Sequence, residues 1–102
     1  MTVPAGRQHP AHLFYVMMPS SAEQSGLIAH LRSLGVIGAF HYQPLHASPA
    51  GLALGRVAQP CPVAMDRSTR LVRLPLYPGL DAEQVDRVLT AVTSYAPGSV
   101  TA

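Results

Sequence analysis

The first third of the chain passes from an apolar run to a helical repeat. Residues 12–18 form a short, nearly continuous apolar run with aromatic residues, which is typical of a buried strand. Residues 20–34 then show the spacing of a helix, in which Ser20 and Glu23 fit a capping box and Gly35 is suited to end it. The apolar face predicted for this helix consists of Leu27, Ile28, Leu31 and Leu34.

The middle of the chain predicts two further strands separated by a long irregular segment. The elements expected there are a strand over 36–42, a loop over 43–62 with one helical turn near 50–54, a short helix over 63–70 and a strand over 71–77. Gly38 allows another backbone to come close to the second strand. Pro75 indicates an edge or irregular position for the third strand, because proline has no N–H to donate within a sheet.

A last helix is predicted after the turn at 78–79, where Asp81 and Gln84 fit a second capping box. Its expected buried face consists of Val85, Val88, Leu89 and Val92. The resulting order of elements predicts an α/β (α+β) fold, a two-layer sandwich in which two helices pack on one face of a small sheet. Residues 1–10 are expected to be a flexible arm or linker remnant, residues 11–96 the folded domain, and residues 97–102 a frayed tail.

Composition adds that part of the apolar surface is meant for a partner. Of the 102 residues, 48% are apolar and 12% charged, which excludes the charge-rich class of disordered proteins and exceeds what a small solvated monomer needs. No apolar run approaches the length of a membrane-spanning helix, and the N-terminal region lacks a signal-peptide core. We therefore expect no membrane partner and a cytoplasmic location.

The charged residues narrow the possible chemistry. All seven cations are arginines, which exceed the five carboxylates by two and are scattered except for the loose group Arg67, Arg70 and Arg73. Such a distribution does not indicate binding to nucleic acid. Because the sequence contains no lysine, no side-chain amine is present to form a Schiff base, and no catalytic residue is assigned. The single cysteine, Cys61, excludes an intramolecular disulfide and is expected to be a small buried thiol.

The densest group of polar side chains follows the predicted second strand. His41, Tyr42, His46 and Ser48 offer titratable and directional hydrogen-bonding groups at a strand end, which suits recognition of a sugar or a phosphate. The alternative is purely structural: one histidine caps the strand, the other lies on the surface, and Tyr42 packs with its hydroxyl in water.

Arg73 and the histidine pairs raise two further questions, an anion contact and a metal site. Arg73 could clamp an anion through its planar guanidinium, or simply project into solvent from the face opposite Val72. The pairs His9–His12 and His41–His46 do not have the spacing of a helical metal-binding pair, so no metal site is predicted.

Two segments in fixed order carry a specific resemblance. The pieces "FHYQPLHASPAG" and "RLVRLPLYPGL", within a match over about residues 7–95, resemble the C-terminal small domain of sugar aminotransferases of the DegT/DnrJ/EryC1/StrS type. These enzymes depend on pyridoxal 5'-phosphate and aminate keto-sugars on nucleotide carriers. The resemblance implies a mostly antiparallel three-stranded sheet with helices on one face. It also implies a loop near the active site, in which His41, Tyr42, His46 and Ser48 face the substrate.

The resemblance further implies an incomplete enzyme. The expected partners are a pyridoxal-phosphate-binding large domain, encoded upstream or as a separate chain, and a sugar nucleotide, in particular a dTDP-4-keto-6-deoxy-sugar. The complete enzyme is expected to be a homodimer, and this chain alone is expected to bind no cofactor and to be inactive. Two alternatives stay open: a stand-alone module for nucleotide-sugar binding or dimerisation, and a non-functional truncated remnant.

Overall fold

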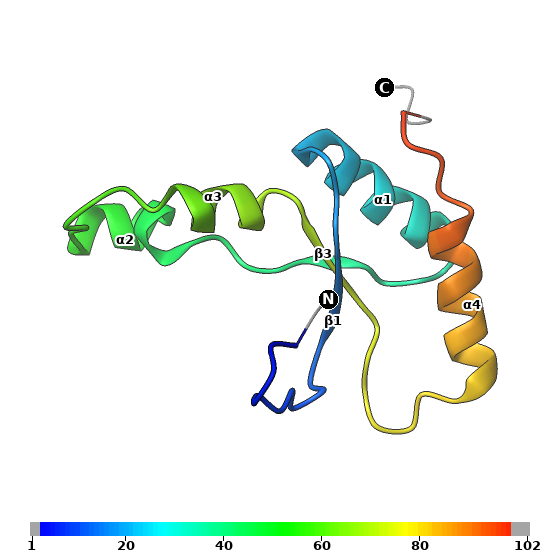
Figure 1. Ribbon diagram of the computed structural model, residues 1–102. Coiled ribbons are helices and arrows are strands. Elements are labelled where there is room, and N and C mark those ends of the chain that lie inside the picture. The colour runs from blue at the N-terminus through cyan, green and yellow to red at the C-terminus, as the bar shows by residue number, and fades with distance from the viewer. Residues whose placement is uncertain (1–2, 99–102) are drawn as a thin grey trace.

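A small sheet and four α-helices make up the protein, as seen in a computed structural model that describes residues 3–98 (Figure 1). The elements in chain order are β1 (Phe14–Met17), α1 (Ser21–Ser33), β2 (Ala39–Phe40), the 3-10 turn η1 (Leu45–Ala47), α2 (Pro49–Leu54), α3 (Pro62–Ser68), β3 (Leu71–Leu74) and α4 (Ala82–Thr93). Each predicted strand and helix is therefore present, although all three strands are shorter than the sequence pattern suggests.

The sheet has the order β1-β3-β2, and both pairings are antiparallel. β1 and β2 therefore run parallel to each other on either side of β3, joined by the crossover through α1. Pro75 predicted an edge or irregular position, and the edge alternative is wrong, because β3 is the central strand. Pro75 is tolerated because β3 ends at Leu74, so the proline lies beyond the last sheet hydrogen bond.

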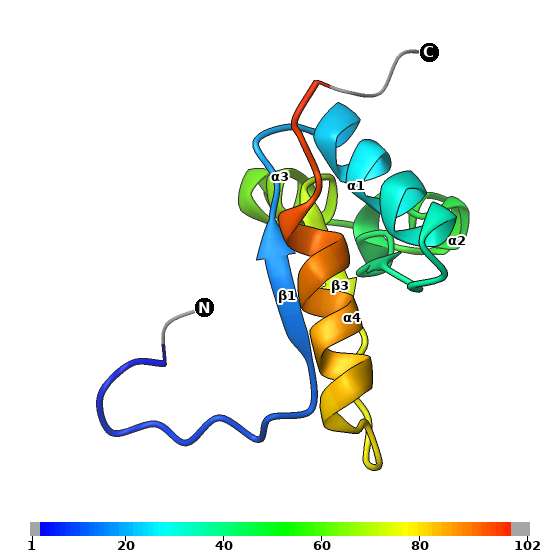
Figure 2. The same cartoon turned by 90° about the vertical axis from the view of Figure 1, so that its right-hand side faces the viewer.

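The core lies between the sheet and the two long helices. α1 and α4 pack on the same face of the sheet, as Figure 2 shows from the helical side. Leu27 and Leu31 of α1 and Val72 of β3 have at most 2% of their surface exposed. Burying three large aliphatic side chains supplies about 5–9 kcal/mol of favourable transfer free energy. The two-layer α/β sandwich predicted from the sequence is thereby confirmed.

The two helices begin with different capping arrangements. At α4 the predicted capping box is complete. The Asp81 carboxylate accepts a hydrogen bond from the backbone N–H of Gln84 at 2.8 Å, and the side-chain carbonyl of Gln84 accepts one from the backbone N–H of Asp81 at 3.0 Å. At α1 only half is present, since Ser20 Oγ accepts from the Glu23 amide at 3.2 Å. The predicted return bond from Glu23 is wrong, because its carboxylate is engaged by the C-terminal segment instead.

The buried face of α4 is rotated from the one predicted. Its inner side follows Val88, Ala91, Val92 and Tyr95, which is a regular helical stripe packed against the core. Val85 and Leu89, which were expected to be buried, are 38% and 54% exposed. They border an apolar groove between α4 and β1, so the apolar face of this helix is wider than the core that covers it.

The C-terminal segment is fastened to α1 through one carboxylate. Tyr95 donates to Glu23 Oε2 at 2.6 Å and the Gly98 amide donates to Glu23 Oε1 at 2.9 Å. His30 lies nearby, with its ring centroid 5.5 Å from that of Tyr95. The fraying expected beyond residue 97 stays a prediction for residues 99–102, which lie outside the described part of the chain, as do residues 1–2 of the expected N-terminal arm.

The Tyr95–Glu23 hydrogen bond makes the free energy of unfolding change with pH in the alkaline range. This bond and burial raise the pKa of Tyr95 to about 12, against about 10 for an ordinary tyrosine. The stabilising contribution is therefore fully present below pH about 10 and is lost as pH rises through 12. We expect the urea midpoint of the wild-type chain to fall across this range, and the fall to be smaller in Tyr95→Phe. Equal slopes for the two proteins would contradict this assignment.

Gly38 stands where β2 meets the core. A Cβ at this position would lie 2.6 Å from Leu31 Cδ1 and 3.3 Å from Val72 Cγ1, both of which belong to fully buried side chains. The close approach expected at Gly38 is therefore present, although the nearest atoms belong to side chains and not to backbone.

We expect Gly38→Ala to destabilise the fold by about 1–3 kcal/mol, because neither buried neighbour has room to retreat. Chemical denaturation of the wild-type and variant chains measures this difference. Ser25→Ala on the exposed side of α1 serves as the control, and its midpoint should be unchanged within error. A Gly38→Ala protein as stable as that control would show that the core gives way at this point.

The segment between β2 and β3 extends away from the rest of the molecule. Residues 44–68, here called the helical arm, contain η1, α2 and α3 and project to the side opposite α4 (Figure 1). The helical turn predicted near 50–54 is thus α2, and the short helix predicted over 63–70 is α3. None of these three helical elements has a buried residue.

Candidate functional site

The candidate site begins with Arg73 on the face of the sheet opposite the core. Arg73 pairs with Tyr15 of β1 and Ala39 of β2, so these three residues lie side by side across the sheet. Its neighbour Val72 points the other way and is fully buried under α1. The short side chain of Ala39 leaves space beside the guanidinium, which is itself only partly exposed.

Tyr42 lies next to this arginine. The Arg73 Cζ atom is 6.0 Å from the centre of the Tyr42 ring, at the outer limit of a cation–π contact. Tyr42 has a φ of 47°, which is the left-handed region that side chains other than glycine seldom adopt. This backbone turn places the ring of Tyr42 against that of His41, with centroids 5.5 Å apart. Of the four predicted loop residues, Tyr42 therefore lies beside Arg73, and His41 lies beside Tyr42.

A shallow hollow of about 180 Å³ is lined in part by Arg73. The other polar residue that lines this hollow is His12, which precedes β1. The remaining walls are apolar and come from Leu13 before β1, from residues 74–76 at the end of β3, and from Ile37 and Ala39 around the start of β2. Neither His12 nor Tyr15 was predicted from the sequence to bind a ligand. The signal available was their position in the apolar run that becomes β1, since pairing with β3 brings that run next to Arg73.

The other two predicted residues lie in the helical arm. Ser48 caps α2: its Oγ accepts from the Gly51 amide at 2.9 Å and donates to the Leu45 carbonyl at 2.8 Å. His46 is half-buried and lines a larger hollow of about 520 Å³ on the arm, together with Leu52 and Arg56. Within residues 3–98 no hydrogen bond or ring contact joins this pair to His41 and Tyr42.

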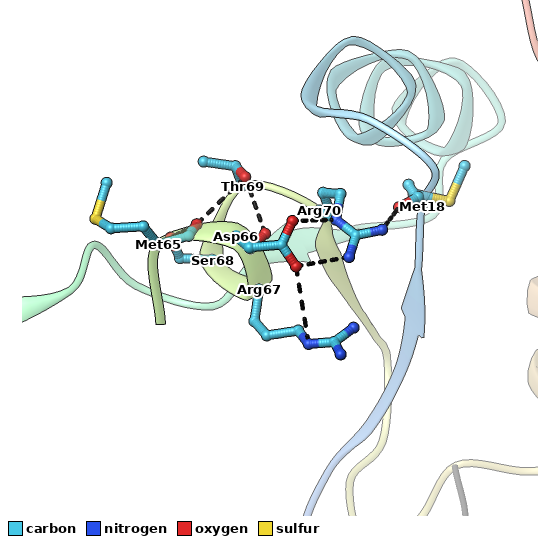
Figure 3. Close-up of polar contacts among 7 residues, drawn as sticks. All are labelled: Met18, Met65, Asp66, Arg67, Ser68, Thr69 and Arg70. Atoms are coloured by element: carbon cyan, nitrogen blue, oxygen red, sulfur yellow. Dashed lines mark hydrogen bonds and ion pairs between the residues drawn. The ribbon is translucent and has the colours of Figure 1, made fainter. Parts of the chain in front are cut away.

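The loose arginine group separates into two roles. Arg70 donates to both carboxylate oxygens of Asp66, at 3.0 and 2.6 Å, and also to the Met18 carbonyl at 3.2 Å (Figure 3). Arg67 lies 3.9 Å from the same carboxylate. The hydrogen bonds from Arg70 hold the pKa of Asp66 below its usual range, and Asp66 raises the pKa of Arg70. Arg70 thus fastens the base of the arm to the end of β1.

Arg73 differs from these two arginines in having no carboxylate partner among residues 3–98. A guanidinium offers five N–H donors in a planar fork that matches the oxygens of a phosphate. An exposed aromatic ring beside it offers a face on which a planar group can stack. The arrangement of Arg73, Tyr42 and His12 is therefore suited to hold an anion with an attached ring system.

Metal ligation and thiol chemistry find no support in this geometry. Across residues 3–98 no three histidine, cysteine or carboxylate side chains lie close enough together to hold a metal ion. His9 and His12 stack with centroids 6.1 Å apart, and His9 Nδ1 accepts from the Ala11 amide. Cys61 is half-buried at the start of α3, with its Sγ 3.7 Å from the Gln59 carbonyl oxygen.

No helix in the described part of the chain is long and apolar enough to cross a membrane.

The chain is similar to known aminotransferases. The model of the DegT/DnrJ/EryC1/StrS aminotransferase family matches residues 1–93. The structure is similar to the aminotransferase TlmJ from Streptoalloteichus hindustanus, with 25% identity and a TM-score of 0.77 over 90% of this chain and 24% of that one. It also shares the fold of Helicobacter pylori PseC, an aminotransferase involved in the biosynthesis of pseudoaminic acid, with 23% identity and a TM-score of 0.66 over 82% of this chain and 24% of that one. The chain therefore spans about a quarter of the length of these two enzymes.

Proposed function

The chain belongs to the DegT/DnrJ/EryC1/StrS aminotransferase family, and from that premise we propose that it is the sugar-nucleotide-binding part of such an enzyme. In this proposal it shapes the substrate pocket and takes no part in bond making. The observation that carries the proposal is Arg73, a guanidinium beside an exposed tyrosine ring with no carboxylate partner among residues 3–98.

The family depends on pyridoxal phosphate, but the residues of this chain do not fit that cofactor. The 102 residues include no lysine, and therefore no side-chain amine to hold it. Three of the five carboxylates are already engaged: Glu23 with the C-terminal segment, Asp66 with Arg70, and Asp81 at the start of α4. In this proposal the cofactor and the catalytic amine belong to a large domain, either a separate chain or an upstream sequence.

Each site residue has a role in the proposed pocket. Arg73 binds a phosphate oxygen of the sugar nucleotide, and Tyr42 and His41 offer ring faces to its planar group. His46 faces the substrate from the arm. Ser48, whose hydroxyl already bonds Leu45 and Gly51, acts by holding the loop in place. None of these residues transfers a proton in the reaction.

The substrate we propose is a dTDP-4-keto-6-deoxy-sugar, which amination converts to a dTDP-4-amino-4,6-dideoxy-sugar of the galactose type. The proposal rests on the paired motifs that follow β2 and form β3, where the candidate site lies. A nucleoside diphosphate supplies the negative charge that Arg73 recognises. The complete enzyme is proposed to be a cytoplasmic homodimer that acts in the synthesis of cell-surface polysaccharide.

A chimeric enzyme tests the proposal. In aminotransferase TlmJ, the quarter that this chain matches is replaced by the present 102 residues, and amino transfer to dTDP-4-keto-6-deoxy-sugars is measured with a panel of amino acids as donors. We expect the chimera to aminate the keto-sugar, and TlmJ without the matched quarter to be inactive.

The same assay on the separate 102-residue chain provides the matched control and should show no transfer. A folded chimera that retains pyridoxal phosphate but aminates no nucleotide-linked keto-sugar would overturn the proposed function. Transfer to a keto-sugar without a nucleotide, at an equal rate, would overturn the role given to Arg73.

A further inference from the structure

The helical arm has an apolar surface that its own chain leaves uncovered. Leu45, Leu52 and Leu54 are 84%, 72% and 90% exposed, and Val57 and Val63 are also largely exposed. Leu45 and Val57 both line the hollow of about 520 Å³ that His46 also borders. Several large exposed apolar side chains on one short segment indicate a contact surface.

The helices of the arm are too short to be stable without a covering partner. α2 has six residues and α3 has seven, whereas isolated helices in water need roughly 12–15 residues even in favourable sequences. No residue of either helix is buried, so packing within this chain does not supply the missing stabilisation. Hydrogen bonds at the base of the arm connect it to the rest of the chain: Arg70 donates to the carboxylate of Asp66 and to the carbonyl of Met18 (Figure 3).

The whole molecule exposes more surface than its mass accounts for. Its accessible area is 7646 Å², whereas a compact monomer of 10.8 kDa exposes about 5,500 Å². The difference of about 2,100 Å² exceeds the roughly 800 Å² that a standard protein–protein interface removes from each partner. The radius of gyration is 15.9 Å against about 13 Å for a compact domain of this length, so the chain is also more extended than its length requires.

The similarity to TlmJ indicates that such an arm also occurs in a much longer enzyme. That match covers 90% of this chain, so at most about ten of the 102 residues fall outside it, fewer than the 25 residues of the arm. Most of the arm therefore has a counterpart in an enzyme four times as long. Between residues 44 and 65 the charged residue is Arg56 and no carboxylate is present, so a covering surface should be apolar with a carboxylate at its rim.

We propose that the helical arm is the surface through which this chain docks on the pyridoxal-phosphate-binding part of the aminotransferase, with Leu45, Leu52 and Leu54 as its anchors. The inference rests on the proposed function, because that function names the partner. It assigns the main contact to the arm and not to the apolar groove between β1 and α4, which Phe14, Val85 and Leu89 border.

Hydrogen exchange in the TlmJ chimera tests the assignment. Amides of residues 45–57 should exchange at least about tenfold more slowly in the chimera than in the separate 102-residue chain, because docking suppresses local opening. The double variant Leu52→Asp/Leu54→Asp should return these amides to the rate of the separate chain. The matched control Ile37→Asp, which replaces an 83% exposed residue outside the arm, should leave the protection intact.

The outcomes separate this inference from the proposed function. An active chimera with an unprotected arm, or with protection confined to residues 85–89, would overturn the docking surface and leave the function standing. An inactive chimera with a protected arm would do the reverse. Protection that appears in the separate chain as its concentration rises would identify a second copy as the occupant and overturn the assignment to the cofactor-binding part.

Discussion

Replacing Arg73 by alanine in the chimeric enzyme is expected to lower kcat/KM for a dTDP-linked keto-sugar by about 100-fold. Removing one partner of a charge-assisted, partly desolvated contact costs about 2–5 kcal/mol, and each 1.4 kcal/mol is a factor of ten. Arg73 has no carboxylate partner in the described part of the chain, so its removal leaves no charge of this protein unpaired. The loss should therefore come from the substrate and appear mainly in KM.

Two comparisons make this result specific to the guanidinium. Arg73→Lys retains the charge but loses the planar fork, so it should recover only part of the affinity. Arg32→Ala removes an equal charge from the exposed side of α1 and should change kcat/KM by less than about twofold. If Arg73→Ala and Arg32→Ala had equal effects, the anion-binding role of Arg73 would be wrong.

Leu31→Ala is expected to destabilise the folded chain by about 2–5 kcal/mol, a large part of the stability of a domain of this size. Leu31 is fully buried at the centre of the core, where it faces Val72 across Gly38. The sheet has only four-residue and two-residue strands, so neighbouring elements have little means to collapse into the cavity. Loss of the cooperative urea transition, followed by circular dichroism, is the expected observation.

Leu34→Ala provides the control within the same helical repeat. Leu34 stands at the C-terminal cap of α1 and is 42% exposed, so its truncation should cost less than about 1 kcal/mol. Similar effects of the two substitutions would mean that the core is not centred on Leu31.

Local patterns were sufficient to predict the elements of the fold. The spacing of Leu27 and Leu31, the glycine at 35 with its φ of 72°, and the capping box of Asp81 and Gln84 all act within a few residues. Such signals require no knowledge of the tertiary structure. The corresponding helices therefore begin and end close to where the sequence places them.

Contacts between distant segments account for what the sequence did not predict. Glu23 leaves its capping position because Tyr95 and the Gly98 amide, more than 70 residues away, compete for its carboxylate. Gln24 is buried within α1, where its side-chain amide donates to the carbonyl of Ser68 at the end of α3 and to that of Leu71 at the start of β3. Neither arrangement leaves a local signature in the sequence.

The candidate site shows the same division between local and distant contacts. His41 and Tyr42 were predicted from one dense polar segment, and Arg73 from its position on a strand. That Tyr42 lies over Arg73 depends on the left-handed turn at Tyr42 and on β2 pairing with β3. His46 and Ser48 are near in sequence but belong to the arm, because the chain leaves the sheet after Phe40 and has entered the arm before η1 begins at Leu45. Their role toward a substrate stays a prediction.

In the proposed function this chain supplies part of a substrate pocket and no cofactor chemistry of its own. Its most direct test is the absorbance of the purified 102-residue chain after incubation with pyridoxal phosphate and removal of the free cofactor. The account predicts a colourless protein that transfers no amino group to a keto-sugar. A protein that stays yellow and aminates a dTDP-linked keto-sugar by itself would contradict it.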